Sequence, residues 1–168
     1  YMALPRVAAL CEVQWADDTQ KNYDDFTKRL PRLIQLYKKL GYNYAKHVFA
    51  VKPEFSIDTA NRAIVVNFST IDDADMYYTL NGSEPTMNSM KSKEALVIKE
   101  PCTLKAAAFR DGEMSNVITE EFKFNKATGC AITMLQPINK QYEFAGANTL
   151  VDGLIAPDTN YQSGRWIA

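Results

Sequence analysis

Adjacent carboxylates are the residues of this chain with the best prospect of acid–base chemistry, because a general acid and a general base must reach the same reacting atoms. There are four such pairs, at Asp17-Asp18, Asp24-Asp25, Asp72-Asp73 and Glu120-Glu121. Successive residues of a strand point to opposite faces, so Glu120 and Glu121 cannot jointly hold one substrate atom. The aspartate pairs fall at expected helix starts and turns, where carboxylates serve as caps and turn residues. We therefore expect no catalytic residue in this chain.

Cofactor and metal sites are not predicted either. His47 is the only histidine, and no Gly-rich phosphate loop or nucleophile elbow is present. The cysteines Cys11, Cys102 and Cys130 are too few and too scattered for a disulfide framework, and we expect free thiols that behave as small hydrophobes. The acidic stretch 72–75 is expected to be a turn; a calcium site is the alternative, although the spacing does not match an EF-hand loop.

Composition limits the class of protein. The 168 residues carry a net charge of −1, with 46% hydrophobic and 23% charged residues. These values are typical of one ordinary or two small globular domains and do not favour a nucleic-acid partner. The sequence contains no apolar run of about 20 residues that would span a membrane, and no signal peptide is visible. Because Tyr1 already falls within a helical pattern, we expect the segment to be an excerpt of a larger protein.

Two helices are expected within residues 1–47. The first starts near Pro5, which suits a first helical turn, and is apolar on nearly all sides. Its apolar residues are Leu4, Val7, Ala8, Leu10, Cys11, Val13 and Trp15. The second is expected to begin at an Asn22 cap and to end at Gly41, with Pro31 kinking it or splitting it in two. A helix that is apolar all round is normally buried in a larger body, so residues 1–47 read as the end of a bigger domain.

The second helix also carries a broad apolar stripe, opposite a face of lysine and arginine that we expect to be solvated. The candidate interface residues on this stripe are Phe26, Leu30, Leu33, Tyr37 and Leu40. An exposed stripe of this breadth would promote aggregation. We expect it to fold onto the rest of the chain or to form a homo-oligomer.

From residue 48 to residue 124 the apolar period changes from 3.6 to 2, which predicts a small antiparallel β-sandwich of the immunoglobulin or fibronectin type. The expected strands lie at 48–51, 55–57, 63–69, 76–80, 95–98, 102–109 and 117–124. Asn81-Gly82 and Asp111-Gly112 are both typical of tight hairpin turns. Tyr77 and Tyr78 are expected to pack across strands, with a sugar-stacking face as the alternative. The predicted fold class is therefore α+β.

Residues 125–168 are expected to form a third, incomplete part. A polar linker at 126–129 precedes an expected strand at 132–135 and a turn-rich stretch. About 44 residues are too few for an independent sandwich, so we expect this part to pack on the middle domain or to extend from it.

Three motifs resemble known families. The run 5–15, Pro-Arg-Val-Ala-Ala-Leu-Cys-Glu-Val-Gln-Trp, is similar to an element at the end of the TIM barrel of family 20 glycoside hydrolases, and Arg29-Leu30 matches a pair in the helix that follows. The run 78–86, Tyr-Thr-Leu-Asn-Gly-Ser-Glu-Pro-Thr, resembles the signature of the sandwich that follows this barrel. The third set resembles the start of a discoidin-like (factor 5/8 C-type) module and comprises Tyr142, Leu150-Val151-Asp152-Gly153, Tyr161 and Arg165-Trp166.

The resemblance implies the C-terminal portion of a β-N-acetylhexosaminidase, which removes terminal N-acetylhexosamine from glycans. In that family an adjacent Asp-Glu pair assists the substrate's own acetamido group. This chain has no Asp-Glu dipeptide, so the catalytic residues would lie before Tyr1. The resemblance also implies a discoidin-like module that binds glycans, with Asp152 as a conceivable calcium ligand. We expect the parent protein to be exported to a periplasmic or extracellular location.

Two further hypotheses remain open at this stage. The chain could instead be a stand-alone β-sandwich that binds carbohydrate or protein, with a helical extension. It could also be a helical adaptor that docks a partner through residues 22–40. The first interpretation predicts that the partner of the helices is the remainder of the catalytic barrel.

Overall fold

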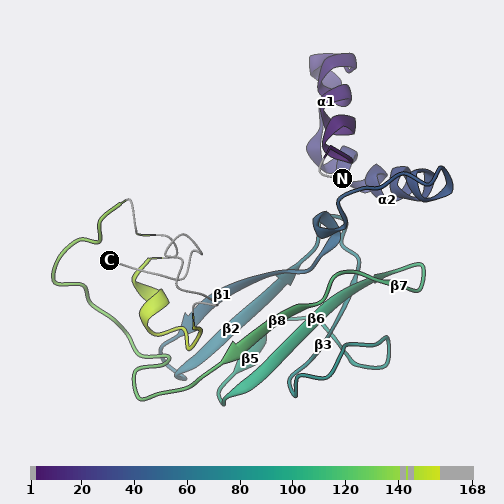
Figure 1. The fold of residues 1–168 in the computed structure, drawn as a ribbon. Coiled ribbons are helices and arrows are strands. Elements are labelled where there is room, and N and C mark those ends of the chain that lie inside the picture. Colours follow the sequence, from purple (N-terminus) through teal and green to yellow (C-terminus); the bar gives the residue numbers. More distant parts are fainter. Residues whose placement is uncertain (1–2, 141–142, 144–145, 156–168) are drawn as a thin grey trace.

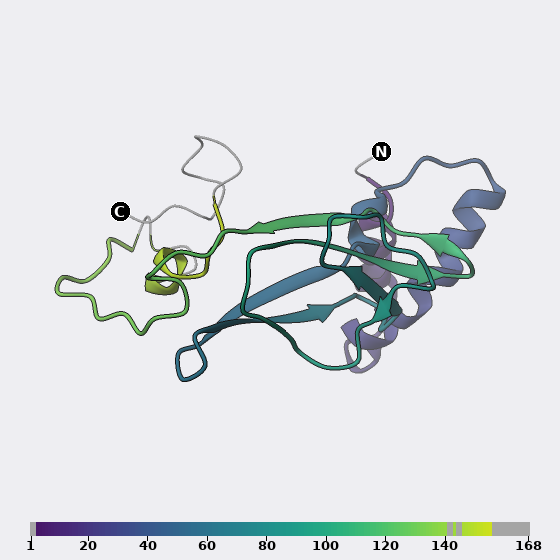
Figure 2. The same cartoon turned by 90° about the horizontal axis from the view of Figure 1, so that it is seen from below.

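The computed structural model describes residues 3–140, 143 and 146–155 (Figure 1). Two helices stand at one end of a two-layered β structure, and the segment after the last strand lies at the opposite end, as both views show (Figures 1 and 2). The predicted α+β class is confirmed. Tyr142, Tyr161, Arg165 and Trp166, which contribute to the discoidin-like resemblance, lie outside the described residues.

The predicted helices form at α1 (Arg6–Trp15) and α2 (Tyr23–Lys39). The side chain of Asn22 accepts a hydrogen bond from the backbone N–H of Asp25 at 3.1 Å, which is the predicted N-cap. Gly41 has a φ of 69° and follows the helix end, as predicted. Pro31 does not split the helix: α2 runs through it without interruption. Packing of the apolar face evidently outweighs the one helical hydrogen bond that a proline removes.

The sandwich contains eight strands among the described residues. They are β1 (Lys52–Asp58), β2 (Ala63–Ser69), β3 (Asp75–Thr79), β4 (Met90–Lys91), β5 (Leu96–Ile98), β6 (Cys102–Arg110), β7 (Glu113–Met114) and β8 (Ile118–Phe122). One sheet has the order β1-β2-β5, and the other has the order β4-β3-β6-β7 with β8 also paired to β6. All of these pairings are antiparallel, as the alternation of apolar residues predicts.

The two sheets face each other across one apolar core. Ile64, Val66 and Ile98 come from the first sheet, and Leu104 and Phe122 from the second. Phe55 and Phe122 meet edge to face across this interface with ring centroids 5.9 Å apart. A second small cluster of Val51, Ala106 and Ala108 continues the core toward the helices. The β-sandwich is therefore held by contacts between alternate residues of both layers.

One of the two predicted hairpin turns is correct and the other is wrong. Asp111-Gly112 joins β6 to β7 as a two-residue turn, with φ values of 51° and 80°. Asn81-Gly82 does not reverse the chain into a neighbouring strand. Asn81 instead forms a parallel bridge to Thr103, and the Gly82 N–H donates to the Thr103 carbonyl at 2.9 Å. The chain after β3 therefore continues beside β6. It pairs with β3 again only when it reaches β4.

Two predicted strands are also wrong. Residues 46–49 form a short 3-10 helix (Lys46–Phe49) instead of a strand at 48–51, because Phe49 turns into the apolar cluster below α2. Residues 132–135 form no strand, and Leu135 is largely exposed. Within the described ranges no strand pairs with this stretch, so its apolar alternation has no sheet to join there.

The described residues after β8 pack against the end of the sandwich. Leu154 forms a bridge with Phe122 and contacts the core, and Val151 is buried. The backbone N–H groups of Lys123 and Gly129 donate to the carbonyls of Gly153 and Val151 at 2.8 and 2.9 Å. Asp152 accepts a hydrogen bond from the Leu154 N–H at 2.8 Å, which is a turn-forming role.

Candidate functional site

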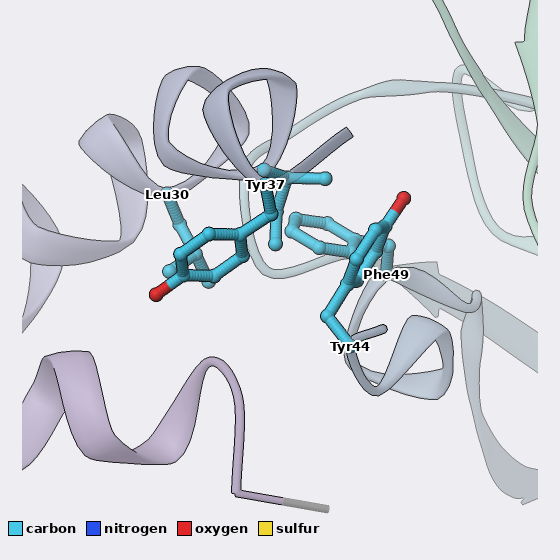
Figure 3. Packing of buried hydrophobic residues seen from close by; sticks show 5 residues of the cluster. Leu30, Tyr37, Tyr44 and Phe49 are labelled. Carbon is cyan, nitrogen blue, oxygen red and sulfur yellow. The ribbon is translucent and has the colours of Figure 1, made fainter. Parts of the chain in front are cut away.

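The predicted interface stripe of α2 is largely used inside this chain. Leu30 and Tyr37 are buried, and Phe26 and Leu33 pack at the edge of the same cluster. Leu40 remains about half exposed. Figure 3 shows the ring of Tyr37 beside Leu30, with its hydroxyl pointing away from Phe49 and Tyr44. Phe49 and Tyr44 lie in and just before the short 3-10 helix, and their rings reach toward α2 and belong to the same cluster. The stripe therefore covers the segment that leads into the sandwich.

Both helices and the turn after α2 also carry apolar side chains that are exposed among the described residues. They are Val7, Leu10, Val13, Trp15, Leu36, Leu40 and Tyr42. None of the residues of α1 is buried, and Trp15 is 88% exposed. A shallow groove between α1 and α2 is lined by residues that include Val7, Cys11 and Tyr37.

The two helices are joined by one charged contact. Arg29 on α2 donates to Glu12 on α1 at 2.5 Å and to Asp25 at 2.9 Å. Hydrogen bonds to these two carboxylates raise the pKa of Arg29 above its ordinary value. This pair fixes α1 beside α2.

The helices meet the sandwich at a junction built around Arg110, the last residue of β6. Its guanidinium donates twice to Asp72, through Nε to Oδ2 at 2.7 Å and through Nη2 to Oδ1 at 2.5 Å. Nη1 donates to the carbonyl of Phe49 at 3.0 Å, and the guanidinium carbon lies 4.9 Å from the centroid of the Phe49 ring. The Asp72 side chain is only 6% exposed. A bidentate pair of this kind fixes both position and orientation.

Outside this buried pair, the β6–β7 hairpin contacts α2 directly. Lys38 on α2 forms an ion pair with Glu113, and Gln35 donates to Asp111 at 2.8 Å. Between these contacts and the apolar cluster lies a cleft of about 130 Å³, with Ile34, Phe49 and Met114 on its apolar side. Charges of both signs line its rim, so the cleft has no strong preference for an anion or a cation.

The Lys38–Glu113 pair should make the junction sensitive to acid. The hydrogen bond that Glu113 accepts from Lys38 lowers the pKa of Glu113 below its ordinary value. A carboxyl group with a depressed folded-state pKa stabilises the fold above its unfolded pKa, and this contribution is lost as the pH falls through the folded value. We therefore expect Glu113→Gln to be slightly less stable than the parent chain at neutral pH and to match it once the pH has fallen below the folded-state pKa of Glu113. Urea unfolding at several pH values measures this, with exposed Glu100→Gln as the control. A difference that grows toward acid pH would contradict the assignment.

The described residues do not gather catalytic or metal-binding groups. No group of three or more His, Cys, Asp or Glu side chains in this part of the chain is arranged to hold a metal ion. Asp72 is engaged with Arg110, and Asp75 with Lys91 at 2.7 Å, so the acidic turn at 72–75 serves to hold the sandwich. Cys11, Cys102 and Cys130 are free thiols, and Cys102 packs against the sandwich core. None of the helices in the described ranges has the length and apolar character of a membrane-spanning segment.

Sequence reasoning missed the central pair of the junction. Arg110 and Asp72 are 38 positions apart, and the sequence predicts for Asp72 a turn, with a calcium site as the alternative. The sequence contains one local signal, because Arg110 lies directly before the Asp111-Gly112 turn. This position does not identify Asp72 as the partner of Arg110.

Comparison with known proteins gives a match for the middle of the chain. Residues 65–122 match the family model described as Fn3 associated, which spans the region from β2 to the end of β8. No curated protein matches the chain. The matched region is the greater part of the β-sandwich, and the helices and the segment after β8 lie outside it.

Proposed function

We propose that this chain is the C-terminal, non-catalytic part of a β-N-acetylhexosaminidase, an enzyme that releases terminal N-acetylhexosamine from glycans. In this role α1 and α2 complete the end of the catalytic barrel, and the sandwich braces the barrel and spaces an accessory module. The observation that carries the proposal is the Fn3-associated match over 65–122, since this domain is found in the C-terminal regions of glycoside hydrolases that include family 20.

The exposed apolar side chains of α1 support the same proposal. A barrel requires helices that are buried on the side facing the strands, and α1 offers an uncovered apolar surface of this type. Glu12, in the Pro-Arg element of the resemblance, pairs with Arg29 of the Arg-Leu pair. The two motifs that resemble the barrel end are thus in contact with one another, as parts of one structural unit would be.

An activity assay of the intact natural gene product and of the 168-residue chain tests the proposal. We expect the intact product to hydrolyse an aryl N-acetyl-β-glucosaminide or galactosaminide, and the chain alone to leave both intact. An aryl β-glucoside is the control, because it lacks the acetamido group on which this chemistry depends. An intact product that is inactive on both substrates, or activity in the chain alone, would refute the proposal.

A stand-alone carbohydrate-binding sandwich is the second candidate, and one observation favours it. Tyr77 lies on the outer face of its sheet, where its ring meets Phe109 with centroids 5.4 Å apart. Lys91 Nζ lies 5.9 Å from the centroid of the same ring. Tyr78, by contrast, packs against Phe68 inside the sandwich. Binding of the isolated chain to a glycan array, lost in Tyr77→Ala, would support this candidate over the first.

A further inference from the structure

Contacts from three separate stretches of chain hold the helices against the sandwich. Arg110 comes from the end of β6, Asp72 from the connection between β2 and β3, and Phe49 from the 3-10 helix that follows α2. One guanidinium touches the other two residues at once, through three hydrogen bonds and the face of the Phe49 ring. We call this set the clasp.

Burial makes the clasp sensitive to the loss of any one member. The Arg110 side chain is 19% exposed, and Asp72 is more deeply buried still. Removing one partner of such a pair leaves the other as an uncompensated charge in a poorly solvated place, which is far more costly than removing both. The guanidinium also satisfies the Phe49 carbonyl, which would otherwise lose its donor.

The clasp reaches α2 through Phe49. The ring of Phe49 packs in one cluster with Leu30, Ile34 and Tyr37 of α2, as Figure 3 shows for the residues it labels. Ile71, next to Asp72, packs against the same cluster. A shift of Phe49 or of the 71–72 turn would therefore loosen the packing of α2 before it disturbed the far end of the sandwich.

We propose that Arg110 is a positioning residue that couples α2 to the β-sandwich, so that the two parts keep one relative orientation and unfold together. This inference deepens the proposed function, on which its biological role rests, because a sandwich that braces a barrel must be rigidly joined to it. The coupling itself is a property of the 168-residue chain and does not depend on any glycosidase activity.

Hydrogen exchange of the 168-residue chain, followed by mass spectrometry, measures the coupling. In the parent chain we expect peptides from α2 and from β2 to open with similar protection, as one cooperative unit. In Arg110→Met we expect the protection of α2 to fall by about tenfold or more relative to that of β2. In Arg110→Met with Asp72→Asn, where neither charge remains, we expect α2 to regain part of this protection.

Two further variants make the test specific. Lys105→Met removes a cation from β6 that pairs with Glu84 on the sandwich surface. This control should leave the ratio of α2 to β2 protection unchanged. Arg110→Lys keeps the charge but not the bidentate geometry, so it should give the same selective loss of α2 protection to a smaller degree. If Arg110→Met does not fold, Arg110→Lys provides the test of the coupling. Equal loss in α2 and β2, or no loss in either, would overturn the proposal while leaving the hexosaminidase proposal open to its own assay.

Discussion

Phe122→Ala is expected to lower the free energy of unfolding by about 3–5 kcal/mol, because it empties the centre of the sandwich. Phe122 is 1% exposed and ends β8, with its ring against Phe55 of the opposite sheet. It also forms the bridge to Leu154 in the segment that follows. The substitution therefore removes contacts to both sheets and to the C-terminal segment together.

Urea unfolding followed by circular dichroism provides the measurement. Val97→Ala on β5 is the matched control, since Val97 is 50% exposed and its loss should change stability by no more than about 0.5 kcal/mol. Phe122→Leu should fall between the two, as it keeps part of the buried volume. A cost for Phe122→Ala similar to that of Val97→Ala would mean that the two sheets do not share this core.

The layers of the sandwich were predictable because they depend on local signals. Alternation at 63–69 indicates a strand, and this stretch forms β2. The predicted strand at 102–109 forms most of β6. The turn at Asp111-Gly112 and the cap at Asn22 are short-range features that act over two or three residues. Such features need no knowledge of what the rest of the chain does.

The errors come from places where distant partners decide the local structure. Asn81-Gly82 has the sequence of a tight hairpin, but Thr103 of β6 donates to the Leu80 carbonyl and accepts from the Gly82 N–H, which keeps the chain beside β6 at this point. Val48 and Phe49 read as a strand, but the apolar face of α2 draws Phe49 into a helical turn. Both outcomes are tertiary effects that override local propensity.

The candidate site also contains one part that the sequence predicts and one part that it does not. The apolar stripe with Leu30 and Tyr37 follows from helical periodicity, and the structure shows what it packs against. The clasp of Arg110, Asp72 and Phe49 depends on three separate stretches of chain meeting in space, which no spacing in the sequence records. Sequence thus indicates that the helices need a partner surface, and only the structure identifies the residues that fix the joint.

Gly129→Ala is expected to release the C-terminal segment from the sandwich, because the added Cβ has no space. Gly129 has a φ of +74°, and a Cβ there would lie 2.6 Å from the backbone carbonyl carbon of Arg62. Backbone atoms at the start of a strand cannot yield as a flexible side chain can. Arg62 is also held in place, since its Nη2 donates to the carbonyl of Lys126 at 2.5 Å. Steric overlap and backbone strain together should cost about 3 kcal/mol or more.

Gly112→Ala separates the steric part of this cost from the conformational part. Gly112 has a φ of +80°, but a Cβ there would meet nothing within 4 Å, so we expect a loss of only about 1 kcal/mol. Urea unfolding compares the two variants, and limited proteolysis shows whether residues 123–130 and 151–155 become more accessible in Gly129→Ala. If the hydrogen bonds from Lys123 to Gly153 and from Gly129 to Val151 hold the segment in place, cleavage there should precede loss of the sandwich. Equal costs for the two glycine variants would show that the close approach of Gly129 to Arg62 does not hold the segment.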